Sequence, residues 1–267
     1  RIIPEISLTP YRIWLATVIV SAISYISYLL RQYVFHESGV LVSGIIGGLY
    51  SSTATITILS RKSKTAPADK LPDYITAMYM AIGMMFLRLM IIIAIFNWSV
   101  FSNLLFPMSF MMLFSCGVGL FTYFKNRKTS RLSVEKDDDS NVKESRDNPL
   151  EFKVALIFAF LFVLFSLLTH YAVVYIGTKG INLLSLVAGF GDITPFVLNL
   201  LEGDFSGVTV HMMVSAILLA TLSNNLIKMT YAIGFSGGRR ELTQPLLRGF
   251  LTIGSVNALV YLLCLLF

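Results

Sequence analysis

Blocks of about 20 apolar residues dominate this sequence and constrain its fold more than any other feature. Eight such segments can be marked, at residues 11–30, 39–60, 74–96, 104–124, 154–176, 180–201, 208–235 and 250–267. A helix needs about 20 apolar residues to cross a hydrocarbon core of roughly 30 Å. Hydrophobic residues make up 55% of the chain and charged residues only 13%. We therefore expect an all-α, polytopic integral membrane protein with about six to eight transmembrane helices.

The formal charge of +6 does not indicate a nucleic-acid partner. Lys and Arg fall mostly in short loops beside the apolar segments, where the positive-inside rule places them. Because the chain begins with Arg1, we expect it to be a piece of a longer protein. Cys116 and Cys264 lie in apolar segments without CxxC spacing, so neither a disulfide nor a metal site is indicated.

A charged stretch divides the chain into two halves. Residues 125–149 contain almost nothing apolar to bury, which predicts a disordered linker. The halves, residues 1–124 and 150–267, each carry about four hydrophobic segments. We expect them to be two internal repeats.

The order of unusual residues supports the repeat. At an offset of about 141 positions, Gly39 matches Gly180, Gly48 matches Gly189, Ser51 matches Asp192 and Thr53 matches Thr194. In the segments that follow, Arg88 matches Lys228, so a cation recurs deep in an apolar span. A shared glycine frame, polar cluster and cation predict duplication.

Each half also contains a helix-breaking motif. Gly47 and Gly48 precede a run of hydroxyl residues, and Pro195 closes the second motif, where it removes a backbone donor. Interrupted helices at matching positions of two repeats indicate a transporter site at the bilayer midplane. The alternative is that the small residues only let helices pack closely.

Charged residues in mid-span sharpen this prediction. Asp192 is costly within a membrane and needs a partner or a function. One alternative is a structural ion pair with Arg88 or Lys228, which leaves the second cation for an anionic solute. We expect a small ion or solute, anionic on this argument, to bind Ser51, Ser52, Thr53, Thr55, Arg88, Asp192, Thr194, Asn224, Asn225 and Lys228.

Enzyme chemistry has no support in the sequence. We find no GxSxG, HExxH, P-loop or dinucleotide-binding motif. Of His36, His170 and His211, only His36 has a carboxylate beside it, Glu37, and a single such pair is not a set of metal ligands. We expect no catalytic residues, no metal and no cofactor.

Several motifs together resemble a known family. They are Gly-Gly-Leu-Tyr-Ser-Ser-Thr-Ala-Thr at 47–55, Asn-Pro-Leu-Glu at 148–151, Gly-Phe-Gly-Asp-Ile-Thr at 189–194 and Leu-Ser-Asn-Asn-Leu-Ile-Lys at 222–228. In this order they resemble the membrane domain of unknown function at the C-terminal side of MgtC/SapB proteins. The resemblance implies a bacterial inner membrane and an N-terminal MgtC-like domain or a second copy as partner. The family tends to carry a second acidic residue after Asp192, but Thr194 and Pro195 stand here, which argues against a paired-carboxylate metal site.

The basic loops distinguish two topologies. If all eight segments cross, the basic residues at 61–70 and at 239–248 fall on opposite sides, against the positive-inside rule. If the two motif segments do not cross, the repeats are inverted and both loops lie on one side. We expect the inverted arrangement, in a transporter or channel surrounded by the lipid bilayer. The alternative function is a regulatory or scaffolding membrane subunit that transports nothing.

Overall fold

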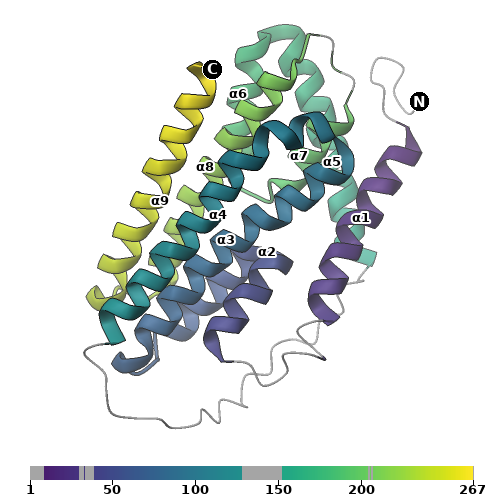
Figure 1. Ribbon diagram of the computed structural model, residues 1–267. Helices are drawn as coiled ribbons and strands as arrows, with labels where there is room; N and C mark the ends of the chain where they lie inside the picture. Colours follow the sequence, from purple (N-terminus) through teal and green to yellow (C-terminus); the bar gives the residue numbers. More distant parts are fainter. Residues whose placement is uncertain are drawn as a thin grey trace.

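The protein is an all-helical bundle, shown in Figure 1 as a computed structural model. The structure describes residues 9–29, 33, 39–127, 152–203, 205 and 207–266, and these include no strand. Among them, six helices are long and apolar enough to cross a membrane. The prediction of a polytopic membrane protein is confirmed.

Nine α-helices and one short 3-10 helix build the described chain. They are α1 (Pro10–Leu29), α2 (Val40–Ser63), η2 (Ala68–Lys70), α3 (Leu71–Phe96), α4 (Trp98–Arg127), α5 (Phe152–Ile176), α6 (Thr178–Ala188), α7 (Thr194–Glu202), α8 (Val210–Phe235) and α9 (Arg240–Leu266). Two helices begin earlier than the apolar pattern predicted, α4 at Trp98 and α9 at Arg240. Polar residues interrupt the apolar pattern near the start of both helices: Ser99, Ser102 and Asn103 in α4, and the first turns of α9. The first three residues of the predicted linker, 125–127, are helical; residues 128–149 lie outside the described part of the chain.

Helices α3 and α8 form the centre of the bundle. They are the most buried of the long helices, and Tyr79, Phe86 and Ile217 lie fully inside. Figure 1 shows α9 and α4 along one side of the bundle and α1 with α5 along the other. Arg88, Asn224, Asn225 and Lys228 lie among the buried residues of these helices, so they face protein or a cavity and not lipid.

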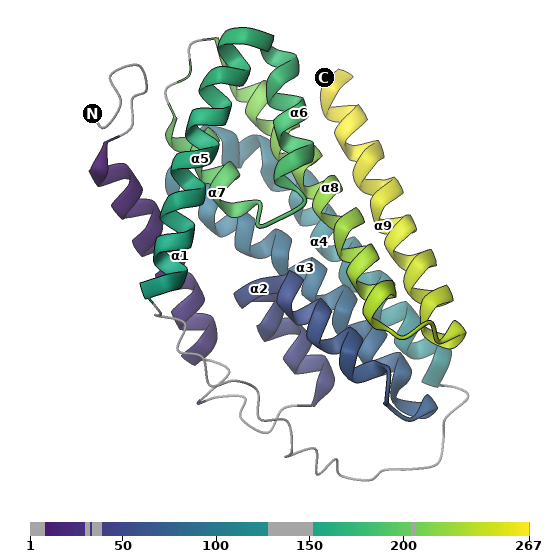
Figure 2. The same ribbon diagram turned by 180° about the vertical axis from the view of Figure 1, so that it is seen from behind.

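Helix α2 folds back on itself. Ser51 has φ −156° and ψ 100°, which is extended backbone inside an otherwise helical run. A Cβ on Gly47 would collide with the Thr55 hydroxyl, although residues eight apart in a straight helix are separated by about 12 Å. Figure 2 shows the first half of α2 running from one end of the bundle to mid-height, and the second half returning to that end. Helix α2 is long enough to cross a membrane, but it does not cross because it turns back at mid-height.

A second hairpin enters from the opposite end. Helix α6 ends at Ala188 and α7 begins at Thr194, with residues 189–193 forming the turn between them. In Figure 2, α6 descends to mid-height and α7 climbs back toward the end where α6 began. Of the six long apolar helices, α2 does not cross, which leaves α3, α4, α5, α8 and α9. Helix α1 has a shorter apolar stretch, but its 20 residues span about 30 Å, so it would be the sixth crossing.

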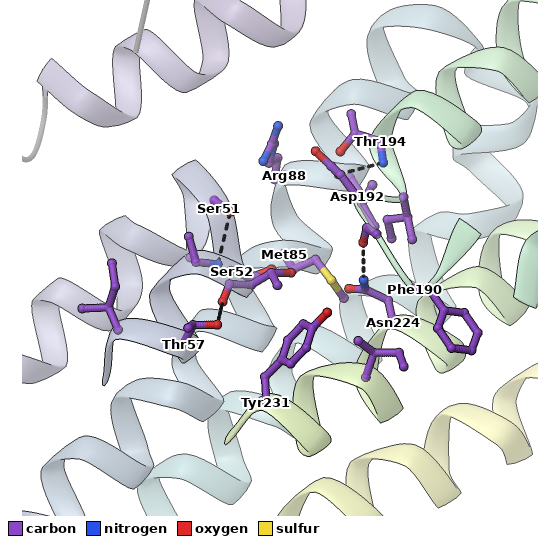
Figure 3. Close-up of a pocket in the computed structure, with 18 of the residues that line it drawn as sticks. Ser51, Ser52, Thr57, Met85, Arg88, Phe190, Asp192, Thr194, Asn224 and Tyr231 are labelled. Carbon is purple, nitrogen blue, oxygen red and sulfur yellow. Dashed lines mark hydrogen bonds between the residues drawn. The ribbon is translucent and has the colours of Figure 1, made fainter. Parts of the chain in front are cut away.

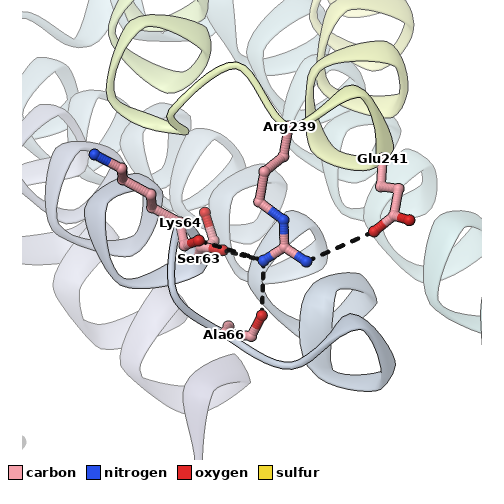
Figure 4. Close-up of polar contacts among 5 residues, drawn as sticks. All are labelled: Ser63, Lys64, Ala66, Arg239 and Glu241. Carbon is pink, nitrogen blue, oxygen red and sulfur yellow. Dashed lines mark hydrogen bonds and ion pairs between the residues drawn. The ribbon is translucent and has the colours of Figure 1, made fainter.

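The two basic loops meet at one end of the bundle (Figure 4). Arg239, just before α9, donates hydrogen bonds from Nη1 to the carbonyl oxygens of Ser63 (3.3 Å), Lys64 (3.4 Å) and Ala66 (2.7 Å). Its Nη2 lies 3.6 Å from the Glu241 carboxylate. This common location is what the inverted topology requires. The duplication of the halves stays a prediction.

Candidate functional site: a cavity between two helix breaks

Both helix breaks border a single cavity of about 520 Å³ (Figure 3). Helices α2, α3 and α8 and the α6–α7 turn contribute its walls. The lining residues are Gly48, Ser51, Ser52, Thr53, Ala54, Thr57, Ile58, Arg61, Met85, Arg88, Leu89, Phe190, Gly191, Asp192, Ile193, Thr194, Asn224, Ile227 and Tyr231. Segments that the sequence separates by some 140 positions therefore face the same space.

Arg88 supports the break in α2. The extended residue Ser51 interrupts the backbone ladder, so the preceding carbonyl needs another donor. Arg88 supplies it from α3, because its Nη1 donates to the Tyr50 carbonyl oxygen at 2.6 Å. The side chain is 9% exposed and its Nε has no partner. One buried cation is thus fixed at the cavity wall with donor capacity left over.

Helix α8 supports the second break in a similar way. Asn224 donates from Nδ2 to the carbonyl oxygens of Gly189 and Gly191, both at 3.0 Å. Ser223 donates to the Leu186 carbonyl oxygen at 2.7 Å. A side chain at Gly189 would collide with Ser223, so glycine permits this close approach. The freed carbonyl groups at the end of α6 are therefore satisfied by α8.

Asp192 lies at the start of α7 and is exposed to the cavity. One carboxylate oxygen accepts a hydrogen bond from the Thr194 backbone N–H at 2.9 Å, in the manner of a helix cap. In the part of the chain that the structure describes, no salt bridge joins Asp192 to Arg88 or Lys228. The structural ion pair weighed from the sequence is not formed, and the carboxylate remains open to the cavity.

Hydroxyl groups of α2 form the facing wall. Ser51 accepts from the Ala54 backbone N–H at 3.3 Å and so caps the second half of α2. Ser52 and Thr53 also border the cavity. With Arg88, Asp192, Thr194 and Asn224, seven of the ten residues predicted to bind solute line this space.

The other three predicted residues lie behind the cavity wall. Thr55 packs against Gly47 within the α2 hairpin. Asn225 is buried, and neither its Nδ2 nor its Oδ1 has a partner. Lys228 is 1% exposed, and its Nζ contacts the Met85 sulfur at 2.6 Å.

Helix geometry explains why α8 divides its polar residues in this way. Asn224, Ile227 and Tyr231 lie three or four residues apart and share the face toward the cavity. Asn225 and Lys228 each follow by one residue, a rotation of about 100° away from that face.

Sequence reasoning missed Thr57, Arg61, Met85 and Tyr231 as lining residues. Arg61 was interpreted only as part of a basic loop. The sequence feature that could have identified Arg61 is its spacing: Ala54, Thr57 and Arg61 lie three and four residues apart, so they share one helix face. The Arg61 guanidinium lies over the Phe235 ring, 4.6 Å from its centroid, so the cavity lining continues toward the basic end.

Two comparisons match the chain to other proteins. Residues 18–236 match a family described as "Domain of unknown function (DUF4010)". An uncharacterized protein from Aquifex aeolicus (strain VF5) is 25% identical over 208 residues, which cover 76% of this chain and 84% of that protein. No solved structure matches the chain.

Proposed function

The chain belongs to the DUF4010 family, whose matched region covers most of its length, and we propose that it is a transporter or channel for a small anion. The single observation that carries the proposal is the cavity between two helix hairpins that enter from opposite ends. Non-helical backbone at membrane depth occurs where it is buried in protein or lines an aqueous cavity. Both breaks border such a cavity, which is the arrangement of solute sites in transporters.

The charges of the lining favour an anion. Arg61 and Arg88 line the cavity, against the single carboxylate of Asp192. Arg88 lines the cavity, and a planar guanidinium can bind a carboxylate or phosphate through two parallel hydrogen bonds. The positive end of α7 is already capped by Asp192, so the proposed selectivity depends on the arginines rather than on that helix dipole.

The lining also suggests how the solute would pass. Toward the basic end, α2 and α8 continue the cavity through Thr57, Tyr231 and the exposed Arg61. On the opposite side, residues 194–201 of α7 are all buried and separate the site from the other end. We propose that the α6–α7 hairpin moves to admit solute from that end, which would give alternating access around a fixed site.

Reconstitution in lipid vesicles tests the proposal. Purified protein is inserted into vesicles, and uptake of radiolabelled chloride, sulfate, phosphate and small carboxylates is measured beside sodium and rubidium. We expect saturable uptake of at least one anion, and loss of that uptake in Arg88→Met. Arg240→Gln is the matched control, because Arg240 is exposed at the basic end and does not line the cavity.

Two different results would contradict this proposal. Uptake of a cation that is lost in Asp192→Asn would overturn the anion assignment but keep transport. Vesicles in which well-folded protein moves no solute would favour the regulatory or scaffolding subunit.

A further inference from the structure

A second hollow lies on the outer surface of the bundle, between α4 and α9. Its volume is about 770 Å³, and no residue that lines it also lines the cavity between the helix breaks. Its lining residues are Phe110, Leu113, Phe114, Gly117, Val118, Phe121, Thr122, Lys125, Pro245, Arg248, Gly249 and Thr252. Figure 1 shows the end of α4 and the start of α9 close together at the lower left of the bundle, from where the two helices diverge. We name this hollow the α4–α9 groove.

The apolar part of the groove has the shape of a chain-binding slot. Gly117 leaves its floor open, because a Cβ at Gly117 would meet no atom within 4 Å. Gly249 cannot carry a larger side chain, because Tyr79 packs against it from α3. Phe110 and Phe121 flank the opening and are partly exposed. An apolar surface of this kind on a membrane helix pair contacts hydrocarbon.

Two cations mark one end of the groove. Lys125 lies in the last turn of α4, and Arg248 lies in the first third of α9. Both side chains are exposed, and the Lys125 ammonium lies 5.9 Å from the centroid of the Phe121 ring. No carboxylate is among the groove's lining residues. The groove is therefore apolar along its length and positive at the end that the bundle shares with its basic loops.

The length of the groove and the two cations at its end indicate which ligand it would bind. From Lys125 to Phe110 the wall of α4 extends over 15 residues, or about 22 Å, which exceeds the depth of one bilayer leaflet. Basic residues at the cytoplasmic side of transmembrane helices attract anionic lipid headgroups. We propose that the α4–α9 groove is a binding site for one anionic phospholipid, with its phosphate at Lys125 and Arg248 and an acyl chain along the phenylalanines.

Measuring lipid binding in detergent solution tests this site directly. Purified protein is incubated with phosphatidylglycerol or phosphatidylcholine, and bound lipid is counted by native mass spectrometry. We expect one phosphatidylglycerol to stay bound at activation energies that remove phosphatidylcholine. The double variant Lys125→Gln/Arg248→Gln should bind phosphatidylglycerol on the order of tenfold to thirtyfold more weakly. Arg240→Gln removes one charge at the same end, outside the groove, and should retain wild-type binding.

A second variant tests the groove itself. Gly117→Phe fills the open floor without touching either cation and should weaken phosphatidylglycerol binding as the charge variant does. Its control is Gly234→Phe, at an exposed glycine of α8 that has equally open surroundings and lies outside the groove. Binding that depends on the cations but not on Gly117 would show headgroup adsorption alone and overturn the proposal. So would displacement of the lipid by millimolar inorganic phosphate, or a second protein copy on this face detected by cross-linking from Phe121→Cys.

Discussion

Arg88 on α3 donates a hydrogen bond to the backbone carbonyl of Tyr50, at the point where α2 turns back on itself. The second hairpin has an equivalent support, because Asn224 on α8 donates to the carbonyl groups of Gly189 and Gly191. A break in each hairpin is therefore stabilised by a side chain from a central helix. The groups that hold the broken backbone are also the groups that line the cavity.

Replacing Arg88 by Lys should separate these two roles. A lysine ammonium can still donate to the Tyr50 carbonyl, so the thermal unfolding midpoint should stay near the wild-type value. It cannot also offer the parallel donors of a guanidinium, so KM for anion uptake should rise on the order of tenfold, the loss of about one charge-assisted hydrogen bond. Arg61→Lys, at an exposed position, should change KM less. A KM unchanged in Arg88→Lys would remove Arg88 from solute binding.

Asn224→Asp should destabilise the second hairpin. The change replaces a donating amide by an accepting carboxylate and leaves the buried Gly189 carbonyl without its donor, at a cost of about 1–3 kcal/mol, while the exposed Gly191 carbonyl loses the same donor but can bond to water. We expect a clearly lower unfolding midpoint by scanning fluorimetry in detergent. Asn103→Asp is the control, since Asn103 is exposed on α4 and only donates to the Ser99 carbonyl of its own helix. Equal midpoints for the two variants would contradict this role of Asn224.

Much of this site follows from the sequence because transmembrane helices restrict where polar residues can lie. The apolar segments predicted the helices, and the glycine and proline positions predicted both breaks. Arg88 and Asp192 were conspicuous because buried charge in a membrane is costly. What the sequence could not resolve was rotation about a helix axis. Neighbouring Asn224 and Asn225 were equal candidates, and only the packing of α8 turns Asn224 to the cavity.

Gly48→Ala tests the close packing that seats the α2 hairpin. A Cβ at Gly48 would lie 2.6 Å from the Cα of Ala81 on α3, so the helices must separate. Overpacking of this kind costs about 1–3 kcal/mol, and the unfolding midpoint should fall accordingly. Gly117→Ala makes the same change in a helix where the new methyl group meets no atom, so its midpoint should be unchanged or higher. A Gly48→Ala midpoint equal to that of Gly117→Ala would mean that α2 is free to shift.

Lys228→Met should behave differently from Arg88→Met, although the sequence predicts that both Lys228 and Arg88 bind the solute. Lys228 is buried behind Met85 and has no carboxylate within salt-bridge distance among the described residues. Removing its charge while keeping an apolar stem should leave the unfolding midpoint unchanged or raise it, since a Lys at mid-membrane costs about 2.5–3.5 kcal/mol on insertion scales. Anion uptake should persist, in contrast to Arg88→Met. If Lys228→Met keeps its fold but loses anion uptake, then Lys228 takes part in solute transport after all.

Asp192→Asn offers the sharpest test of solute charge. The asparagine oxygen can still accept from the Thr194 N–H, so the start of α7 should keep its cap and the protein its stability. Asp192→Ala loses that acceptor and should lower stability by about 1 kcal/mol, which serves as the control for the cap. Among the described residues, Asp192 is the one carboxylate on the cavity wall, so Asp192→Asn removes it while Arg61 and Arg88 remain and makes the potential at the site more positive. Anions should then bind more tightly, seen as a lower KM in vesicle uptake. If the protein instead carries a cation, or couples anion movement to one held by Asp192, the same variant should lose uptake altogether despite an unchanged unfolding midpoint.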